Sequence, residues 1–192
     1  MVKQIIHYPT PLGMQYATDV RVFDEALFAL IDDLKDTIKE NNLDGLAALQ
    51  IGNYYNVIVV RDEDGKLLEM VNPRLIAHEG KTTQKESTLY YGDLEAEIQR
   101  HEKICVVYQD RDGKDCSLEV GGALARVIQR KIDYTFGATF ILKMSKKERE
   151  LFEKALEEKY HHTHRFKKSW LLKGLGVIAM MVMLFFVYSL FG

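Results

Sequence analysis

Residues Gly121–Phe136 read GGALARVIQRKIDYTF, and their apolar positions repeat with the period of an α-helix. The positions that share one face are Leu124, Val127, Ile128 and Ile132. Upstream, residues Phe23–Asn41 show the same spacing at Leu27, Leu30, Ile31, Leu34 and Ile38. A helix with one apolar face packs that face against a core. We therefore predict two amphipathic helices.

Between these two segments lie short runs of β-branched and other apolar residues. Two pairs of runs are joined by Asp-Gly turns: Val57–Arg61 with Leu67–Asn72, and Ile104–Asp110 with Ser117–Val120. Asp-Gly is a frequent hairpin turn because glycine adopts a positive φ without steric strain. Strands combined with a buried helix predict a domain of the α+β class.

The composition is that of a folded domain with an acidic body. The chain has 192 residues, of which 47% are hydrophobic and 28% charged, and this excludes a disordered chain. Residues 1–142 carry more Asp and Glu than Lys and Arg. Nucleic acid is therefore not expected as a partner, because phosphate binding needs cations. The two cysteines, Cys105 and Cys116, are too few for a disulfide scaffold.

The C-terminal part of the chain has a different character. No charged residue occurs from Gly174 to Gly192, and a helix of that length matches the hydrocarbon thickness of a bilayer. Basic residues precede this segment, which predicts that the domain before it is cytoplasmic. We expect a domain over residues 1–144, an amphipathic and basic stem helix over 145–169, and one transmembrane helix over 170–192.

The residues alone indicate no catalytic cluster. None of the six histidines lies four residues from another on a predicted helix, the spacing that presents two imidazoles to one metal ion. The chain also contains neither a GxSxG nucleophile motif nor a phosphate-binding P-loop.

Three segments nevertheless resemble, in order and spacing, one known family, the peptide deformylases. They are LDGLAALQIG at residues 43–52, ESTLY at 86–90 and QRKIDYTFG at 129–137, beside the family patterns GxGLAAxQIG, EGCLS and QHExDHxxG. The resemblance implies a peptide-deformylase-like fold, with antiparallel sheets around a central helix. The activity that it implies is removal of the formyl group from nascent bacterial proteins.

The chain departs from this family at the positions that carry its chemistry. In the family a cysteine and two histidines hold Fe²⁺ or Zn²⁺, and those positions are Thr88, Arg130 and Tyr134 here. The family's general acid/base glutamate is replaced by Lys131. A hydroxyl, a guanidinium and a phenol do not bind such an ion. We therefore expect no catalytic residue, no metal and no other cofactor, and a catalytically inactive pseudoenzyme rather than an enzyme.

Part of the family's pocket is expected to remain at Gly45, Gln50, Thr88, Leu89, Arg100, Arg130 and Tyr134. The resemblance implies that Gln50 and the Leu89 backbone N–H stabilise an oxyanion and that Arg100 flanks a peptide groove. The resemblance also places the backbone of Gly45 against the substrate. Gly45, Gln50 and Arg100 each have a structural interpretation as well: a close approach of strands, satisfaction of neighbouring backbone groups, and a solvated charge. Leu43 and Leu49 replace a glycine and a proline of the family, which alters the loop between them.

Arg130 lies on a helix that is expected to be buried, and an unpaired buried charge is strongly unfavourable. We expect Arg130 to form an ion pair with Glu86 that fills the former metal site, with Asp133 as the second candidate partner. The alternative is that Arg130 extends to solvent through an open pocket.

Together these features predict a protein tethered to the cytoplasmic face of the bacterial inner membrane. Its expected role is that of an interaction or accessory subunit, with the lipid bilayer and a membrane protein or complex as partners. One alternative is a module that binds a peptide or an anion in the remaining pocket. A second alternative is a peptide deformylase with non-standard chemistry.

Overall fold

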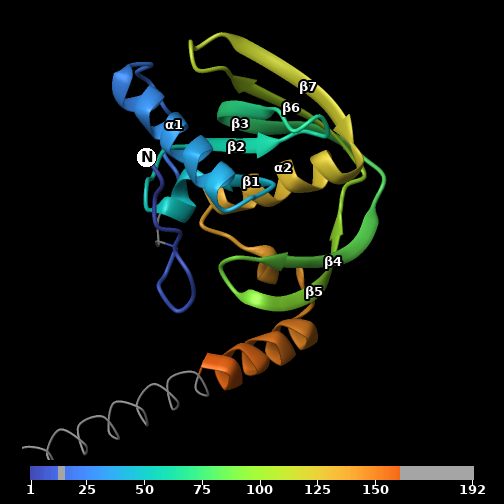
Figure 1. The fold of residues 1–192 in the computed structure, drawn as a ribbon. Helices are drawn as coiled ribbons and strands as arrows, with labels where there is room; N and C mark the ends of the chain where they lie inside the picture. The colour runs from blue at the N-terminus through green and yellow to red at the C-terminus, as the bar shows by residue number, and fades with distance from the viewer. Residues whose placement is uncertain (13–15, 161–192) are drawn as a thin grey trace, which may run out of the picture. The chain divides into compact units, whose positions relative to one another are not determined.

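The computed structural model describes residues 1–12 and 16–160 of the chain. Residues Met1–Ser145 form one compact unit, and the unit that follows begins at Lys146. The first unit contains a five-stranded antiparallel sheet of order β1-β2-β3-β6-β7 and a two-stranded sheet β4-β5 (Figure 1). The elements are α1 (Glu25–Glu40), β1 (Gly45–Ala47), β2 (Val57–Arg61), β3 (Leu67–Glu79), β4 (Thr82–Thr88), β5 (Gly92–Arg100), β6 (Lys103–Gln109), β7 (Asp115–Gly121) and α2 (Gly122–Thr135), with short 3₁₀ helices at Ala48–Ile51 and Phe140–Lys143.

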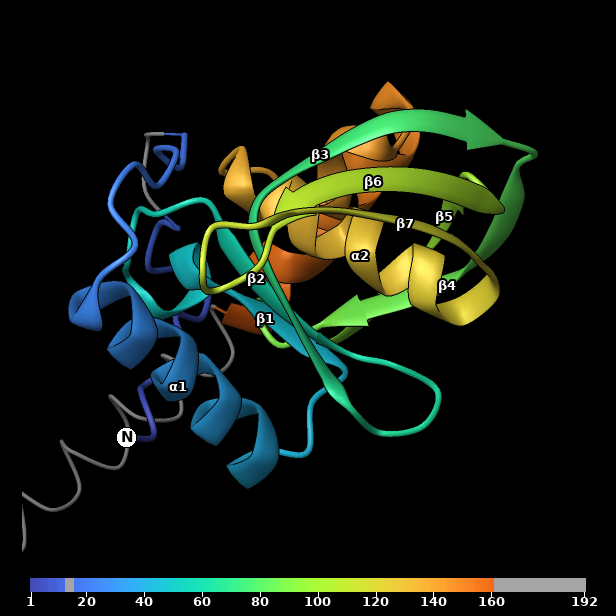
Figure 2. The same cartoon turned by 90° about the horizontal axis from the view of Figure 1, so that it is seen from above.

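The core is organised by strand β2, which is buried on both faces. Val57 and Val59 belong to the apolar cluster of α1, whereas Ile58 and Val60 belong to the cluster of α2. This division follows from the pleat, because successive side chains of a strand point to opposite faces. Figure 2 shows α1 and α2 on either side of β1 and β2. The α+β class is thereby confirmed.

Both predicted helices are confirmed, within two residues at each end. Asp24 caps α1, because its Oδ1 accepts hydrogen bonds of 3.1 Å from the N–H groups of Ala26 and Leu27. The predicted apolar positions of α1 are all buried, and Thr37 joins them. The Thr37 hydroxyl is satisfied there, since it donates to Asp33 O at 2.7 Å.

The two predicted hairpins are confirmed as β2–β3 and β6–β7. Their turns contain Gly65 and Gly113, with φ of 82° and 81°, and each turn is closed by a preceding aspartate that accepts two backbone N–H groups. The hairpin β4–β5 was not predicted. Most of its side chains are polar and exposed, so the apolar alternation that identifies a strand is missing from its sequence.

In the second unit, residues 146–160 are helical. The division into parts at 144 and 169 stays a prediction. The predicted transmembrane helix over 170–192 lies outside the described residues.

Candidate functional site

A cavity of about 360 Å³ opens where α2 approaches β1 and the end of β4. In Figure 1, α2 runs between the five-stranded sheet and the β4–β5 hairpin. All the pocket residues expected from the sequence, except Arg100, line this cavity. Its lining consists of Asn42, Leu43, Asp44, Gly45, Gln50, Ser87, Thr88, Leu89, Gly92, Arg130, Lys131 and Tyr134. Folding therefore brings the three quoted segments to one place.

Gly45 allows β1 to lie close against β2. A Cβ atom at this position would stand 2.8 Å from Val59 O and 3.0 Å from Val60 Cα, distances that side chains do not tolerate. Gly45 is therefore required for a close approach of the two backbones, which in turn sets the wall of the cavity.

Gln50 and Leu89 supply neutral polar groups to the cavity. Gln50 is 2% exposed, and its Oε1 accepts the Ala47 N–H at 3.0 Å. The carbonyl side of the amide is thus engaged by backbone, and the Nε2 side is what Gln50 offers to the cavity. The Leu89 carbonyl is engaged by His7, whose Nδ1 lies 2.7 Å from it, and the Leu89 N–H is the group that this residue offers to the cavity.

The cations of the cavity belong to what we call the Asp44 cluster: Asp44, Arg130 and Lys131. Arg130 Nη2 donates to Asp44 Oδ2, and Lys131 Nζ lies 3.5 Å from Asp44 Oδ1. The Lys131 side chain is 7% exposed. Burial lowers the pKa of Lys131 to about 8, although Asp44 partly opposes that shift. The amine therefore titrates close to neutral pH.

The expected pair between Arg130 and Glu86 is not formed, and this prediction is corrected. Asp44 takes Arg130 instead, because the loop before β1 reaches α2 at that point. The alternative interpretation, Arg130 extending to solvent, also fails, since its side chain is only 15% exposed. Asp44 was missed as a functional residue, although its place beside Gly45 in the first quoted segment was a usable signal.

Glu86 lies instead in what we call the Glu86 cluster: Glu86, Arg100, Arg126 and Asp133. Arg100 donates to both oxygens of Glu86, at 2.6 and 3.0 Å, and to Asp133 Oδ2 at 2.8 Å. Arg126 Nε lies 3.1 Å from Glu86 Oε1 as an ion pair without hydrogen-bond alignment. Burial lowers the pKa of Arg100, but Glu86 and Asp133 outweigh it and raise that pKa overall.

This arrangement corrects the expected role of Arg100. Its side chain has no exposure and connects β5 to β4 and α2, so it does not flank a peptide groove. A bidentate bond between a guanidinium and a carboxylate is among the strongest polar contacts in proteins. The interior of this region is therefore held by ion pairs.

Tyr134 adds a buried phenol to the lining of the cavity. The residue is 1% exposed, and its hydroxyl makes no hydrogen bond of standard geometry with any residue in the described part of the chain. Burial raises the pKa of Tyr134 to about 12, although the neighbouring Thr88 lowers it in part. The phenol is therefore neutral at physiological pH, and it can donate a proton to an acceptor in the cavity.

These side chains do not fit a divalent metal ion. Arg130 and Lys131 are cations that repel one, and the Tyr134 phenol keeps the proton that a ligand would have to lose. Over residues 1–12 and 16–160, no group of three or more His, Cys, Asp or Glu side chains is arranged to hold a metal. In place of metal ligands, the cavity offers the amine of Lys131 and neutral hydrogen-bond donors.

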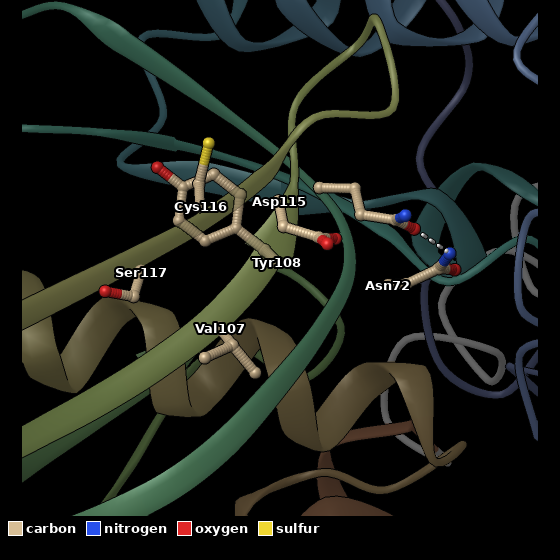
Figure 3. A pocket seen from close by; sticks show the side chains of 7 residues that line it. Asn72, Val107, Tyr108, Asp115, Cys116 and Ser117 are labelled. Atoms are coloured by element: carbon tan, nitrogen blue, oxygen red, sulfur yellow. Dashed lines mark hydrogen bonds between the residues drawn. The ribbon is translucent and has the colours of Figure 1, made fainter.

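A second hollow, of about 570 Å³, lies at one end of the β6–β7 hairpin (Figure 3). Asn72 and Asp115 belong to its rim, and Asn72 donates to Gln109 Oε1 at 2.9 Å. Cys116 lines it beside Tyr108. None of the site residues expected from the sequence lies here.

Comparison with known proteins gives one family. Residues 2–150 match the family model described as polypeptide deformylase. A curated peptide deformylase of Syntrophobacter fumaroxidans is 35% identical over 162 residues, which are 82% of this chain and 95% of that protein. One of Campylobacter jejuni is 37% identical over 167 residues, covering 83% and 95%.

Solved structures agree. The peptide deformylase of Thermus thermophilus superposes with a TM-score of 0.76 at 32% identity and covers 88% of this chain and 99% of that one. The peptide deformylase of Legionella pneumophila gives 0.76 at 29% identity, covering 86% and 99%. The expected peptide-deformylase-like fold is confirmed.

The comparisons contradict the expected function. We predicted a catalytically inactive interaction or accessory subunit and no enzyme, but the curated relatives at 33–37% identity are named as peptide deformylases over most of this chain. Such similarity points to an ordinary deformylase, and the prediction is corrected accordingly.

The expected location at the bacterial inner membrane is contradicted as well. The same relatives point to an ordinary deformylase rather than to a membrane-tethered protein. Among the helices that the structure describes, none combines the length and the apolar character needed to cross a membrane.

Proposed function

Because this chain belongs to the peptide deformylase family, we propose that it is a peptide deformylase, which removes the formyl group from the amino-terminal end of a peptide. The observation that carries the proposal is the match of residues 2–150 to the family, together with curated relatives of that name. The cavity beside α2 supports it, because the three segments that carry the resemblance line that cavity together.

The donors of the cavity suit the carbonyl oxygen of a formyl group. Gln50, Leu89 and Tyr134 all line the cavity, and each carries a donor: the Gln50 amide Nε2, the Leu89 backbone N–H and the Tyr134 hydroxyl. Hydrogen-bond donors that are fixed before the reaction stabilise the negative charge that develops on that oxygen. Because Gln50 and Tyr134 are buried, these two side chains need little reorganisation when the charge appears.

Lys131 is the group that can move a proton. With a pKa near 8, part of its population is a neutral amine at physiological pH, and a general base works best with such a value. In the proposed reaction a water attacks the formyl carbon while Lys131 Nζ accepts the water proton. The ammonium then returns the proton to the peptide nitrogen as the C–N bond breaks, which leaves formate and a free amino-terminus.

The test measures formate released from a formyl-methionyl peptide by the full-length protein. We expect release to increase with pH through about 8 and to resist a chelator, since the side chains of the cavity do not fit a metal. Lys131→Met should lower the rate by about 10²-fold or more. Lys103→Met, at an exposed lysine of β6, is the matched control and should leave the rate unchanged.

The chelator also controls for a contaminating metal enzyme, because it would inhibit such an enzyme. The activity of a contaminant would also remain in the Lys131→Met preparation. Absence of formate from the wild-type protein would overturn the proposed function. Release that Lys131→Met does not change would overturn the role of the amine.

A further inference from the structure

We propose that the cavity beside α2 contains a binding site for a carboxylate, formed by Lys131, Tyr134 and Gln50 at the place where metal ligands are expected from the family. The proposal rests on the proposed function in placing a ligand in this cavity, but it is tested without any formylated substrate. It follows from three properties of the described residues: charge, unused donors and space.

The first property is the charge balance of the Asp44 cluster. Two cations, Arg130 and Lys131, meet one carboxylate, Asp44. The balance is therefore one positive charge. It is located at the cavity, because Glu86 and Asp133 are already engaged by Arg100, whereas Asp44 alone serves both Arg130 and Lys131.

The position of Asp44 makes the imbalance larger at Lys131. Asp44 is 47% exposed and Lys131 is nearly buried, so water screens the carboxylate more than the ammonium. The Nζ–Oδ1 distance of 3.5 Å is also longer than that of a good charge-assisted hydrogen bond. An anion inside the cavity would supply Lys131 with the close acceptor that Asp44 does not provide.

The second property is a buried donor whose hydrogen bonding is incomplete. The hydroxyl of Tyr134 is enclosed and lies beside Thr88, but it makes no hydrogen bond of standard geometry with the residues that the structure describes, and Tyr134 lines the cavity. Buried polar groups in native proteins nearly always have a partner. Gln50 lines the same cavity, and because its Oε1 accepts the Ala47 N–H, its Nε2 is a further donor. An acceptor-only ligand would satisfy an ammonium, a phenol and an amide together.

The third property selects the kind of anion. A carboxylate carries one negative charge, which equals the excess positive charge of the Asp44 cluster, whereas a phosphate dianion or sulfate brings more negative charge than this cluster can balance. A volume of about 360 Å³ leaves room for further atoms attached to the carboxylate. The same chemistry is presented by a free small acid such as formate or acetate, and by a carboxylate that is part of a peptide.

The experiment titrates the full-length protein with sodium formate, sodium acetate, and a short unformylated peptide bearing one carboxylate, each by isothermal titration calorimetry. Sodium chloride and sodium phosphate at equal ionic strength are the controls, as is the same peptide with its carboxylate amidated. Saturable binding of formate and acetate identifies a free acid as the ligand, and binding of the peptide but not its amide identifies a peptide carboxylate.

Two variants test whether Tyr134 and Lys131 bind the carboxylate. Tyr134→Phe removes only the hydroxyl and should weaken carboxylate binding about fivefold or more, while Lys131→Met should weaken it at least tenfold. Lys103→Met should bind as the wild type does. Circular dichroism and thermal unfolding of each variant show that it is folded, so that a loss of binding is not a loss of structure.

Equal heats with chloride and with every carboxylate would overturn the proposal, and so would carboxylate binding that survives both Tyr134→Phe and Lys131→Met. These outcomes are separate from those of the formate-release assay. Binding without turnover would overturn the proposed function alone, and turnover without binding would overturn the carboxylate site alone.

Discussion

Glu86 and Asp44 both face cations from α2, but the two carboxylates differ in burial and in the number of bonds that they make. Glu86 is 2% exposed and holds Arg100 through both of its oxygens, with Arg126 close by. Asp44 is 47% exposed and is shared by Arg130 and Lys131. The buried and fully hydrogen-bonded pair of Glu86 and Arg100 holds the fold together. Asp44, which is half-exposed and shared, neutralises only one of its two cations, so the adjoining cavity keeps a positive charge.

Helix α2 contributes to both clusters. Arg126 and Arg130 are one turn apart on α2, so they lie on the same side of the helix. Arg126 points to the interior of the β4–β5 hairpin, where its guanidinium also donates to Ile98 O. Arg130 reaches the loop before β1 and lines the cavity. The same residue type thus supports the fold at one position and shapes the site at the next.

The largest effect is expected for Glu86→Gln. The substitution removes the charge that compensates Arg100 and Arg126 in the interior, and it should lower the free energy of unfolding by about 3–5 kcal/mol. Urea denaturation measures the change. Glu79→Gln, at the exposed end of β3, is the matched control and should have almost no effect. A similar small loss for both variants would contradict the structural role of the Glu86 cluster.

The second effect concerns pH and Lys131. The folded protein releases the Lys131 proton near pH 8, but the unfolded chain keeps it to about 10.5. Between these values the unfolded state binds more protons, so the free energy of unfolding should rise with pH. The rise attributable to this group is about 3 kcal/mol, and it should be absent from Lys131→Met. Parallel pH curves for the two proteins, from urea denaturation at pH 7 to 10.5, would contradict the burial of the amine.

A smaller effect is expected for Asp44→Asn, the counterpart of Glu86→Gln. Because Asp44 is half exposed, water already screens its pairs, and the loss of stability should be about 1 kcal/mol. The substitution also removes the only negative charge of the Asp44 cluster, so acetate should bind more tightly in the calorimetric titration. A loss as large as that of Glu86→Gln would mean that the two clusters do not differ.

The smallest effect is a gain. Tyr134→Phe removes a buried hydroxyl that has no standard hydrogen bond within the described structure, and the ring that remains packs as before. The variant should be more stable than the wild type by about 0.5–1 kcal/mol in the absence of a carboxylate. Thermal unfolding with and without acetate checks this, and the advantage of the variant should disappear when acetate is present.

The predictability of the fold differed between its apolar and polar parts. α1, α2 and the hairpins β2–β3 and β6–β7 follow from apolar spacing and Asp-Gly turns, which are local signals. The β4–β5 hairpin was missed because its strands are mostly polar, and it is held instead by ion pairs from α2. A mostly polar strand of this kind cannot be predicted from its own residues, because the ion pairs that hold it involve residues far away in the sequence.

The candidate site was predicted in part. The three segments of the resemblance do meet at one cavity, and most of the expected residues line it. The partners of the charges were not predictable, since Arg130 was assigned to Glu86 and is bonded to Asp44, and Arg100 was assigned to a groove and is buried. The function expected from the replaced ligand positions was overturned by similarity over the whole domain.

The sequence alone established the local features: the spacing of apolar residues in helices, the turn residues and the family motifs. Each of these signals extends over only a few neighbouring positions, so it can be located without knowledge of the fold. Which carboxylate meets which cation depends on segments far apart in the chain, and it is settled by burial: a charge withdrawn from water must take whichever partner the packed backbone brings within reach. Asp44 and Arg130 are such a pair, and the cavity that they border arises only when β1, β4 and α2 are packed together.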